Sequence, residues 1–145
     1  MLSNLGNITL FFNVLVTLSI IYFSYQSVKN RDQVVSRNFY QLCLLQSTLI
    51  IMSFIILITG FVISDFSILT VYQNSHTLKP WIYKISGSWG NHEGSLLLWL
   101  IILTVFSFLF LVYNKKRPAN YRIYTLLVQN FLIIGFLFFL LFNSN

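Results

Sequence analysis

Charged residues are scarce in this chain of 145 residues: they make up 8% of the sequence and include only three acids. A soluble domain carries about a quarter charged residues, which solvate its surface. Hydrophobic residues instead make up 57% of the chain and aromatic residues 18%. The composition therefore excludes an ordinary soluble domain and indicates an integral membrane protein.

Cysteine is almost absent as well, because the only one is Cys43, inside an apolar stretch. A single cysteine excludes an internal disulfide, a thiol relay and a CxxC haem-handling motif within the chain. The sequence also lacks a glycine-rich phosphate loop, zinc-binding spacing and the Ser-His-Asp order of hydrolases. We interpret Cys43 as a small buried hydrophobic residue and predict no metal site.

Four long apolar stretches are present, and each approaches the 20 or so residues that a helix needs to cross a bilayer core of about 30 Å. They cover residues 6–27, 40–63, 96–113 and 123–142. The first is too long for a secretory signal and lacks a charged start and a small-residue cleavage site. The sequence therefore predicts an all-α integral membrane protein with four transmembrane helices in a single membrane domain, residues 1–145.

Basic residues are concentrated in the two connections 28–39 and 114–122, which hold seven of the nine Lys and Arg residues. The connection 64–95 carries two basic and two acidic residues, and is neutral. Because basic loops stay on the cytoplasmic or matrix side, we expect 64–95 to be an outer loop on the opposite side, together with both termini. This clustering between apolar spans argues against nucleic-acid binding.

Asp, Glu, Lys, Arg and His are absent from all four predicted spans. Such groups mark proton relays, ion sites and transmembrane haem ligands, so the sequence argues against all three in this chain, and against a small transporter. Mildly polar residues recur there instead: Thr9, Asn13, Thr17, Ser24, Gln46, Ser53, Gly60, Gln129 and Asn130. We interpret them as helix-packing faces, used either within the bundle or against a partner chain.

The outer loop is too long for a simple turn and carries an apolar, aromatic pattern of its own, with Trp81, Tyr83, Ile85 and Trp89. Pro80 suits the first turn of a helix. Aromatic side chains favour the headgroup region of a bilayer. We therefore expect a short interfacial helix from about Lys79 to Ser88.

The run WGNHEGSLLLWL, residues 89–100, contains the only close His-Glu pair at the start of an apolar span. Asn91 can cap the third transmembrane helix, and the dipole of that helix favours Glu93 in its first turn by about 0.3–1 kcal/mol. His92 suits a ligand or a proton carrier near neutral pH, although a hydrogen-bonded structural role is more common. The candidate functional motif is Trp89, Gly90, His92, Glu93, Gly94, Ser95 and Trp99, in which Gly94 permits close packing. His76 is a weaker candidate, and the two histidines leave bis-histidine ligation open.

Residues 66–99, FSILTVYQNSHTLKPWIYKISGSWGNHEGSLLLW, closely resemble a segment near the N-terminus of CcmF, the membrane subunit of the cytochrome c haem lyase. The ordered matches are Phe66, Ser67, Tyr72, Asn74, Ser75, Leu78, Pro80, Tyr83, Lys84, Trp89, Gly90, His92, Glu93, Gly94, Ser95, Leu96, Leu97, Leu98 and Trp99. The flanking spans match in hydropathy and order only. The resemblance implies a role in cytochrome c maturation, in which haem is attached through thioether bonds to apocytochrome c.

The resemblance assigns no haem ligand to this chain, because the tryptophan-rich haem-binding loop and the haem-ligating histidines of CcmF lie further along that polypeptide. It implies a subunit that is not catalytic alone, one product of a split gene. Companion CcmF chains would supply the haem pocket, and apocytochrome c and a haem chaperone would be indirect partners. The alternative is a structural or interaction subunit of a larger respiratory complex with no haem chemistry of its own.

Gene splitting of this kind occurs in some mitochondria. The abundance of Phe, Ile, Leu, Asn, Tyr and Lys suits an AT-rich organellar genome, although an AT-rich bacterium would give the same composition. We therefore expect a mitochondrial inner-membrane protein whose outer loop and termini face the intermembrane space. A bacterial inner membrane, with the same parts periplasmic, is the alternative.

Overall fold

The computed structural model describes residues 2–31 and 34–143, which are all-helical apart from turns and connections. The helices are α1 (Leu2–Asn30), α2 (Arg37–Ile63), α3 (Leu69–Asn74), α4 (Trp81–Gly87), α5 (His92–Tyr113) and α6 (Ala119–Asn143). Helices α1, α2, α5 and α6 are long and apolar enough to cross a membrane. The predicted fold class, all-α with four candidate membrane-spanning helices, is confirmed.

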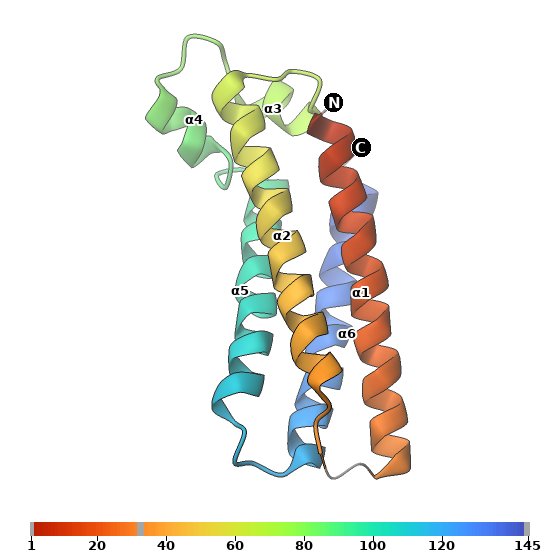
Figure 1. The fold of residues 1–145 in the computed structure, drawn as a ribbon. Coiled ribbons are helices and arrows are strands. Elements are labelled where there is room, and N and C mark those ends of the chain that lie inside the picture. Colours follow the sequence, from red (N-terminus) through yellow and green to blue (C-terminus); the bar gives the residue numbers. More distant parts are fainter. Residues whose placement is uncertain (1, 32–33, 144–145) are drawn as a thin grey trace.

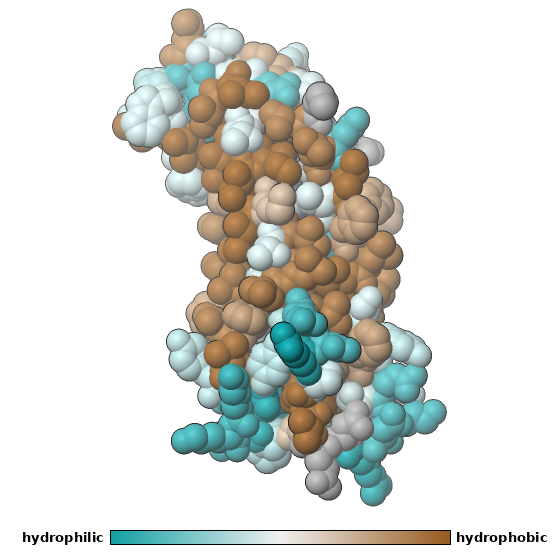
Figure 2. Space-filling view, in the orientation of Figure 1, coloured by the Kyte–Doolittle hydropathy of each residue, from teal (hydrophilic) through white to brown (hydrophobic). Residues whose placement is uncertain are grey.

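The four long helices form a bundle in which α1 packs on α2 and α6, and α5 packs on the same two helices. Figure 1 shows α3, α4 and both chain ends at one end of the bundle, which we call the α4 end. Residues 34–36 and the connection 114–118 lie at the other end. Figure 2 shows a hydrophobic middle and hydrophilic side chains gathered at this second end, which we call the basic end.

Each long helix extends beyond the apolar stretch from which it was predicted. The reason is that helix ends are set by capping and not by hydropathy. Helix α5 begins at His92, so the connection before it is 64–91 rather than 64–95. Helix α2 ends at Ile63 and is capped by Ser64, whose left-handed backbone (φ 57°, ψ 49°) turns the chain and whose N–H donates to the Phe61 carbonyl. The motif residues from His92 onward therefore belong to a helix, not a loop.

The connection at the α4 end contains two short helices where the sequence predicted one. The predicted helix 79–88 is α4, which begins after Pro80 and ends at Gly87. Helix α3 was not predicted, because its six residues have no capping side chain and depend on packing. Val71 is buried against α2, where a Cβ on Gly60 would lie 3.6 Å from it.

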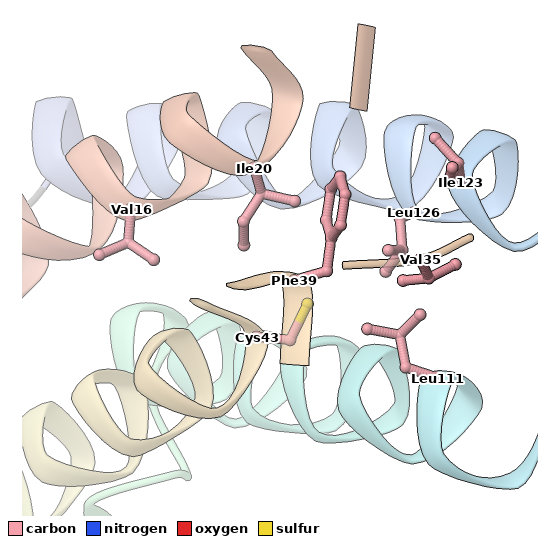
Figure 3. Close-up of a cluster of buried hydrophobic side chains, with 8 residues drawn as sticks. All are labelled: Val16, Ile20, Val35, Phe39, Cys43, Leu111, Ile123 and Leu126. Atoms are coloured by element: carbon pink, nitrogen blue, oxygen red, sulfur yellow. The ribbon is translucent and has the colours of Figure 1, made fainter. Parts of the chain in front are cut away.

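Two hydrophobic clusters form the core of the bundle. The one nearer the basic end comprises Val16, Ile20, Val35, Phe39, Cys43, Leu111, Ile123 and Leu126, whose side chains point toward one another in Figure 3. The other comprises Leu10, Ile50, Leu97, Leu100, Ile133, Leu137 and Leu140. Cys43 is fully buried in the first cluster, which confirms its interpretation as a small hydrophobic core residue.

A buried hydrogen-bond network joins α1, α2 and α6 in the interior. Asn13 Nδ2 donates to the Gln46 carbonyl at 2.7 Å. Gln46 Nε2 donates to Thr17 Oγ1 at 2.8 Å and to Asn130 Oδ1 at 2.9 Å. Such bonds contribute about 0.6 kcal/mol each inside a membrane. The packing-face interpretation is confirmed, and these four side chains, being buried within one chain, are not available to a partner chain.

Arg122 is a buried ionisable residue in α6 that the sequence placed in a loop. Its side chain is 5% exposed. Its Nη2 donates to the Leu111 carbonyl at 2.9 Å and to the Tyr40 hydroxyl. The Tyr40 ring also lies near the Lys115 ammonium, with 5.9 Å between the nitrogen and the ring centroid. Arg122 therefore ties α2, α5 and α6 together at the basic end.

Arg122→Met should lower the stability of the bundle, because methionine retains much of the packing stem but leaves the Leu111 carbonyl and Tyr40 hydroxyl without their donor. An unsatisfied buried polar group costs about 1–3 kcal/mol. The measurement is the thermal unfolding midpoint of the purified chain in detergent. Arg117→Met, at an exposed residue of the same connection, is the matched control. Equal midpoints for the two variants would contradict a tying role for Arg122.

Candidate functional site at the start of α5

The candidate motif begins in the tight turn between α4 and α5 and continues into α5. The amide of Gly90 donates to the Ser86 carbonyl at 3.1 Å, so the chain continues to coil after α4 ends. Asn91 then adopts an extended backbone, with φ −116° and ψ 170°. This change of backbone direction starts α5 at His92 and leaves Gly94 beside Ser88, which caps the end of α4.

Asn91 holds the turn with both atoms of its side-chain amide. Its Oδ1 accepts from the Gly94 amide at 2.7 Å, which is the predicted N-cap bond. Its Nδ2 donates back to the Gly87 carbonyl at 2.8 Å and to the Ser88 carbonyl at 3.3 Å. The sequence predicted the cap but not the second set of bonds. One buried amide therefore joins the last turn of α4 to the first turn of α5.

Gly94 lies so close to the preceding backbone that no other residue fits. A Cβ at this position would lie 1.7 Å from the Ser88 carbonyl oxygen and 2.7 Å from its carbon. The sequence predicted close packing at Gly94, and the structure shows that the packed atoms are backbone of the same turn. Gly90 is less restricted, because its Cβ would lie 3.3 Å from the Ser86 oxygen.

The two histidines are exposed and are not brought together. The His92 ring packs near Phe139 of α6, with 5.6 Å between ring centroids, and makes no hydrogen bond to any described residue. His76 lies in the connection between α3 and α4. Within residues 2–31 and 34–143, no group of three potential metal ligands occurs, and no contact joins the two rings. The remaining motif side chains Trp89 and Trp99 are 42% and 59% exposed.

A pocket of about 110 Å³ lies beside the turn at the α4 end. Residues from five helices or their flanks line it. They include Asn7 of α1, Ser53 of α2, Thr70 of α3 and Leu140 of α6, and α5 contributes Glu93. Among the described residues, Glu93 is the only ionisable one in its lining, and its side chain is half-buried. The sequence did not predict this pocket, because it exists only where segments distant in sequence converge.

The other charged side chains at the α4 end have partners within the chain. The Ser67 hydroxyl donates to Asp65 Oδ1 at 2.6 Å and the Ser67 amide at 3.1 Å; these bonds lower the pKa of the Asp65 carboxyl. Lys79 Nζ donates to the Asn74 carbonyl at 2.8 Å, and Lys84 Nζ to Ser64 Oγ at 2.6 Å. Glu93 makes no side-chain hydrogen bond to any described residue.

Three curated relatives share extended sequence similarity with the chain. CycK of Rhizobium meliloti, a cytochrome c-type biogenesis protein, is 47% identical over 97 residues, or 67% of this chain. The cytochrome c-type biogenesis protein ccl1 of Rhodobacter capsulatus is 47% identical over 102 residues, or 70% of this chain. CcmF of Escherichia coli is 36% identical over 93 residues, or 64% of this chain.

The matched stretches amount to only 14–16% of the length of these three relatives. No family model matches the chain. No solved structure matches it either. The sequence identities nevertheless extend well beyond residues 66–99. The chain is therefore a homologue of the cytochrome c-type biogenesis proteins CcmF, CycK and ccl1, corresponding to a CcmF-like portion of them.

Proposed function

We propose that the chain is a subunit of a cytochrome c haem lyase system and supports haem attachment to apocytochrome c without being catalytic alone. The observation that carries this proposal is 36–47% identity to cytochrome c-type biogenesis proteins over about two thirds of the chain. The geometry adds a reason for the position of the motif, because the Gly94 backbone and the Asn91 side-chain amide hold the start of α5 against the end of α4.

The described residues do not fit a haem site. His76 and His92 are both exposed, no contact joins them, and neither lines the pocket at the α4 end. We therefore place the haem and its ligands on a companion chain, and assign no chemical step to His76 or His92.

Companion CcmF-like chains are the partners we propose, because the relatives are several times longer than the stretch they share with this chain. Apocytochrome c and a haem chaperone would then meet the assembled complex rather than this chain. The basic end, with its Lys and Arg clusters, would face the matrix or cytoplasm under the positive-inside rule. The α4 end would face the intermembrane space of a mitochondrion, or the periplasm of a bacterium.

A structural subunit of a larger respiratory complex is the second candidate function, and the lack of a joined histidine pair among the described residues is the observation that favours it. Purification of the C-terminally tagged chain from its native membrane in mild detergent distinguishes the two candidate functions. The proposed function predicts companion CcmF-like chains in the purified complex. Stoichiometric respiratory subunits without cytochrome c maturation proteins would support the second candidate instead.

His92→Ala should lower the amount of haem-bound cytochrome c while apocytochrome c is still made and exported. The imidazole is exposed and free of hydrogen bonds to described residues, so its loss should affect contacts in the assembled complex more than the fold. The measurement is covalent haem staining of cytochrome c beside an immunoblot of the apoprotein. His76→Ala is the matched control, since that ring is also exposed but lies outside the turn. Equal haem attachment in both variants and the wild type would remove His92 from the functional motif.

A further inference from the structure

We propose that the pocket beside Glu93 receives a protonated side chain, lysine or arginine, from a companion chain. The inference rests on the proposed function, which supplies the companion. It adds the place of contact and the chemistry of the contacting group.

The charge pattern at the α4 end points to an external cation. Asp65, Lys79 and Lys84 each have a hydrogen-bond partner within the chain. Glu93 has none among the described residues, although its side chain is half-buried. A companion chain that covers the pocket would remove this carboxylate from water, and a cation held beside it would offset the cost of that burial. The dipole of α5 stabilises Glu93 in part, but it supplies no hydrogen bond to the carboxylate because the nearby Gly94 amide donates to Asn91.

The pocket itself suits a long cationic side chain. A cavity needs only about 15 Å³ to hold one water, so about 110 Å³ is room for a larger group. Leu10, Leu57 and Leu97 line it with apolar atoms, which fit the methylene stem of lysine or arginine. Asn7 and Thr70 contribute polar residues to the same lining. A metal ion fits less well, because no second acidic or histidine ligand is present among the described residues that line the pocket.

The chain's own N-terminal amino group is the competing occupant, because Leu2 and Ser3 also line the pocket. Carbodiimide coupling distinguishes the two possible occupants, since it joins a carboxylate directly to an adjacent amine. A peptide in which Glu93 is linked to the N-terminal amino group of the same chain would overturn the proposal.

The test is companion retention by the tagged chain, purified from native membranes as the wild type and as Glu93→Asp, Glu93→Gln and Glu93→Lys. Asp65→Asn is the matched control, because it removes a carboxylate at the same end that does not line the pocket. Loss of a buried charge pair weakens an interface by about tenfold or more. We expect Glu93→Gln and Glu93→Lys to retain about a tenth of the companion or less, and Glu93→Asp and Asp65→Asn to retain most of it.

Two results would overturn the inference while leaving the proposed function intact. The first is companion retention by Glu93→Lys equal to that of the wild type. The second is an equal loss of companion retention in Glu93→Asp and Glu93→Gln, because the shape of the side chain at position 93, and not its charge, would then decide binding. Helical content measured on each purified variant excludes misfolding as the cause of a loss. A wild-type complex that contains no companion would overturn the proposed function, and this inference with it.

Discussion

Gly94→Ala should break the turn between α4 and α5 and abolish support of cytochrome c maturation. The new Cβ would lie 1.7 Å from the Ser88 carbonyl oxygen, and neither position can be moved by rotating a side chain, so the clash has no local relief. The turn must open, which breaks the bond from the Gly94 amide to Asn91. Loss of such a cap alone costs about 1–2 kcal/mol, and the displaced backbone adds to that cost.

Gly135→Ala is the matched control for this prediction. Gly135 lies within α6, and a Cβ there would have no atom within 4 Å. The control should leave the unfolding midpoint unchanged or raise it, because alanine is favoured over glycine in a helix by about 1 kcal/mol. Thermal unfolding in detergent and haem staining of cytochrome c are the two measurements. Equal behaviour of the two variants would contradict the close contact at Gly94.

Asn91→Ala should have the next largest effect, because one side chain supplies three bonds of the turn. It removes the acceptor for the Gly94 amide and the donor for the Gly87 and Ser88 carbonyls. A lost cap costs about 1–2 kcal/mol, and each further hydrogen bond about 1 kcal/mol. We expect a destabilisation of about 3–4 kcal/mol, measured as the free energy of unfolding in detergent.

Asn91→Asp separates the contribution of the amide oxygen, which accepts a hydrogen bond, from that of the amide nitrogen, which donates. Aspartate keeps an acceptor for the Gly94 amide, and its charge suits the start of α5. It loses the donor and places an oxygen against the Gly87 and Ser88 carbonyls. We expect the stability of Asn91→Asp to fall between those of the wild type and Asn91→Ala. A variant as stable as the wild type would show that the bonds back to α4 contribute nothing.

The four long helices could be predicted from the sequence because a bilayer imposes length and apolarity together. A span must satisfy its backbone internally and bury about 20 apolar residues, so hydropathy alone locates it. The cap at Asn91 was also predictable, because an Asn followed by a carboxylate at the start of an apolar run is a local signal. Gly94 was predicted to pack closely, but only the folded turn identifies Ser88 as its neighbour.

Arg122 and the pocket could not be predicted, because both depend on segments distant in sequence. Arg122 directly precedes an apolar stretch and belongs to a basic cluster, so the positive-inside pattern assigned it to a loop. Its actual partners, Tyr40 and the Leu111 carbonyl, are on two other helices. The polar residues of α1 and α2 illustrate a related limit. Their helical faces were predicted correctly, but the sequence left open whether Asn13 and Gln46 meet each other or a companion chain.

Depletion of the chain from its native membrane tests the central claim most directly. The measurement is the amount of haem covalently attached to cytochrome c, relative to the amount of apocytochrome c. If the chain is a subunit of the haem lyase system, its depletion should lower the amount of covalently bound haem while the apoprotein persists. Re-expression of the wild type should restore attachment, and re-expression of Gly94→Ala should not. Unchanged haem attachment after depletion, together with loss of a respiratory complex that lacks c-type haem, would contradict a role in the haem lyase system.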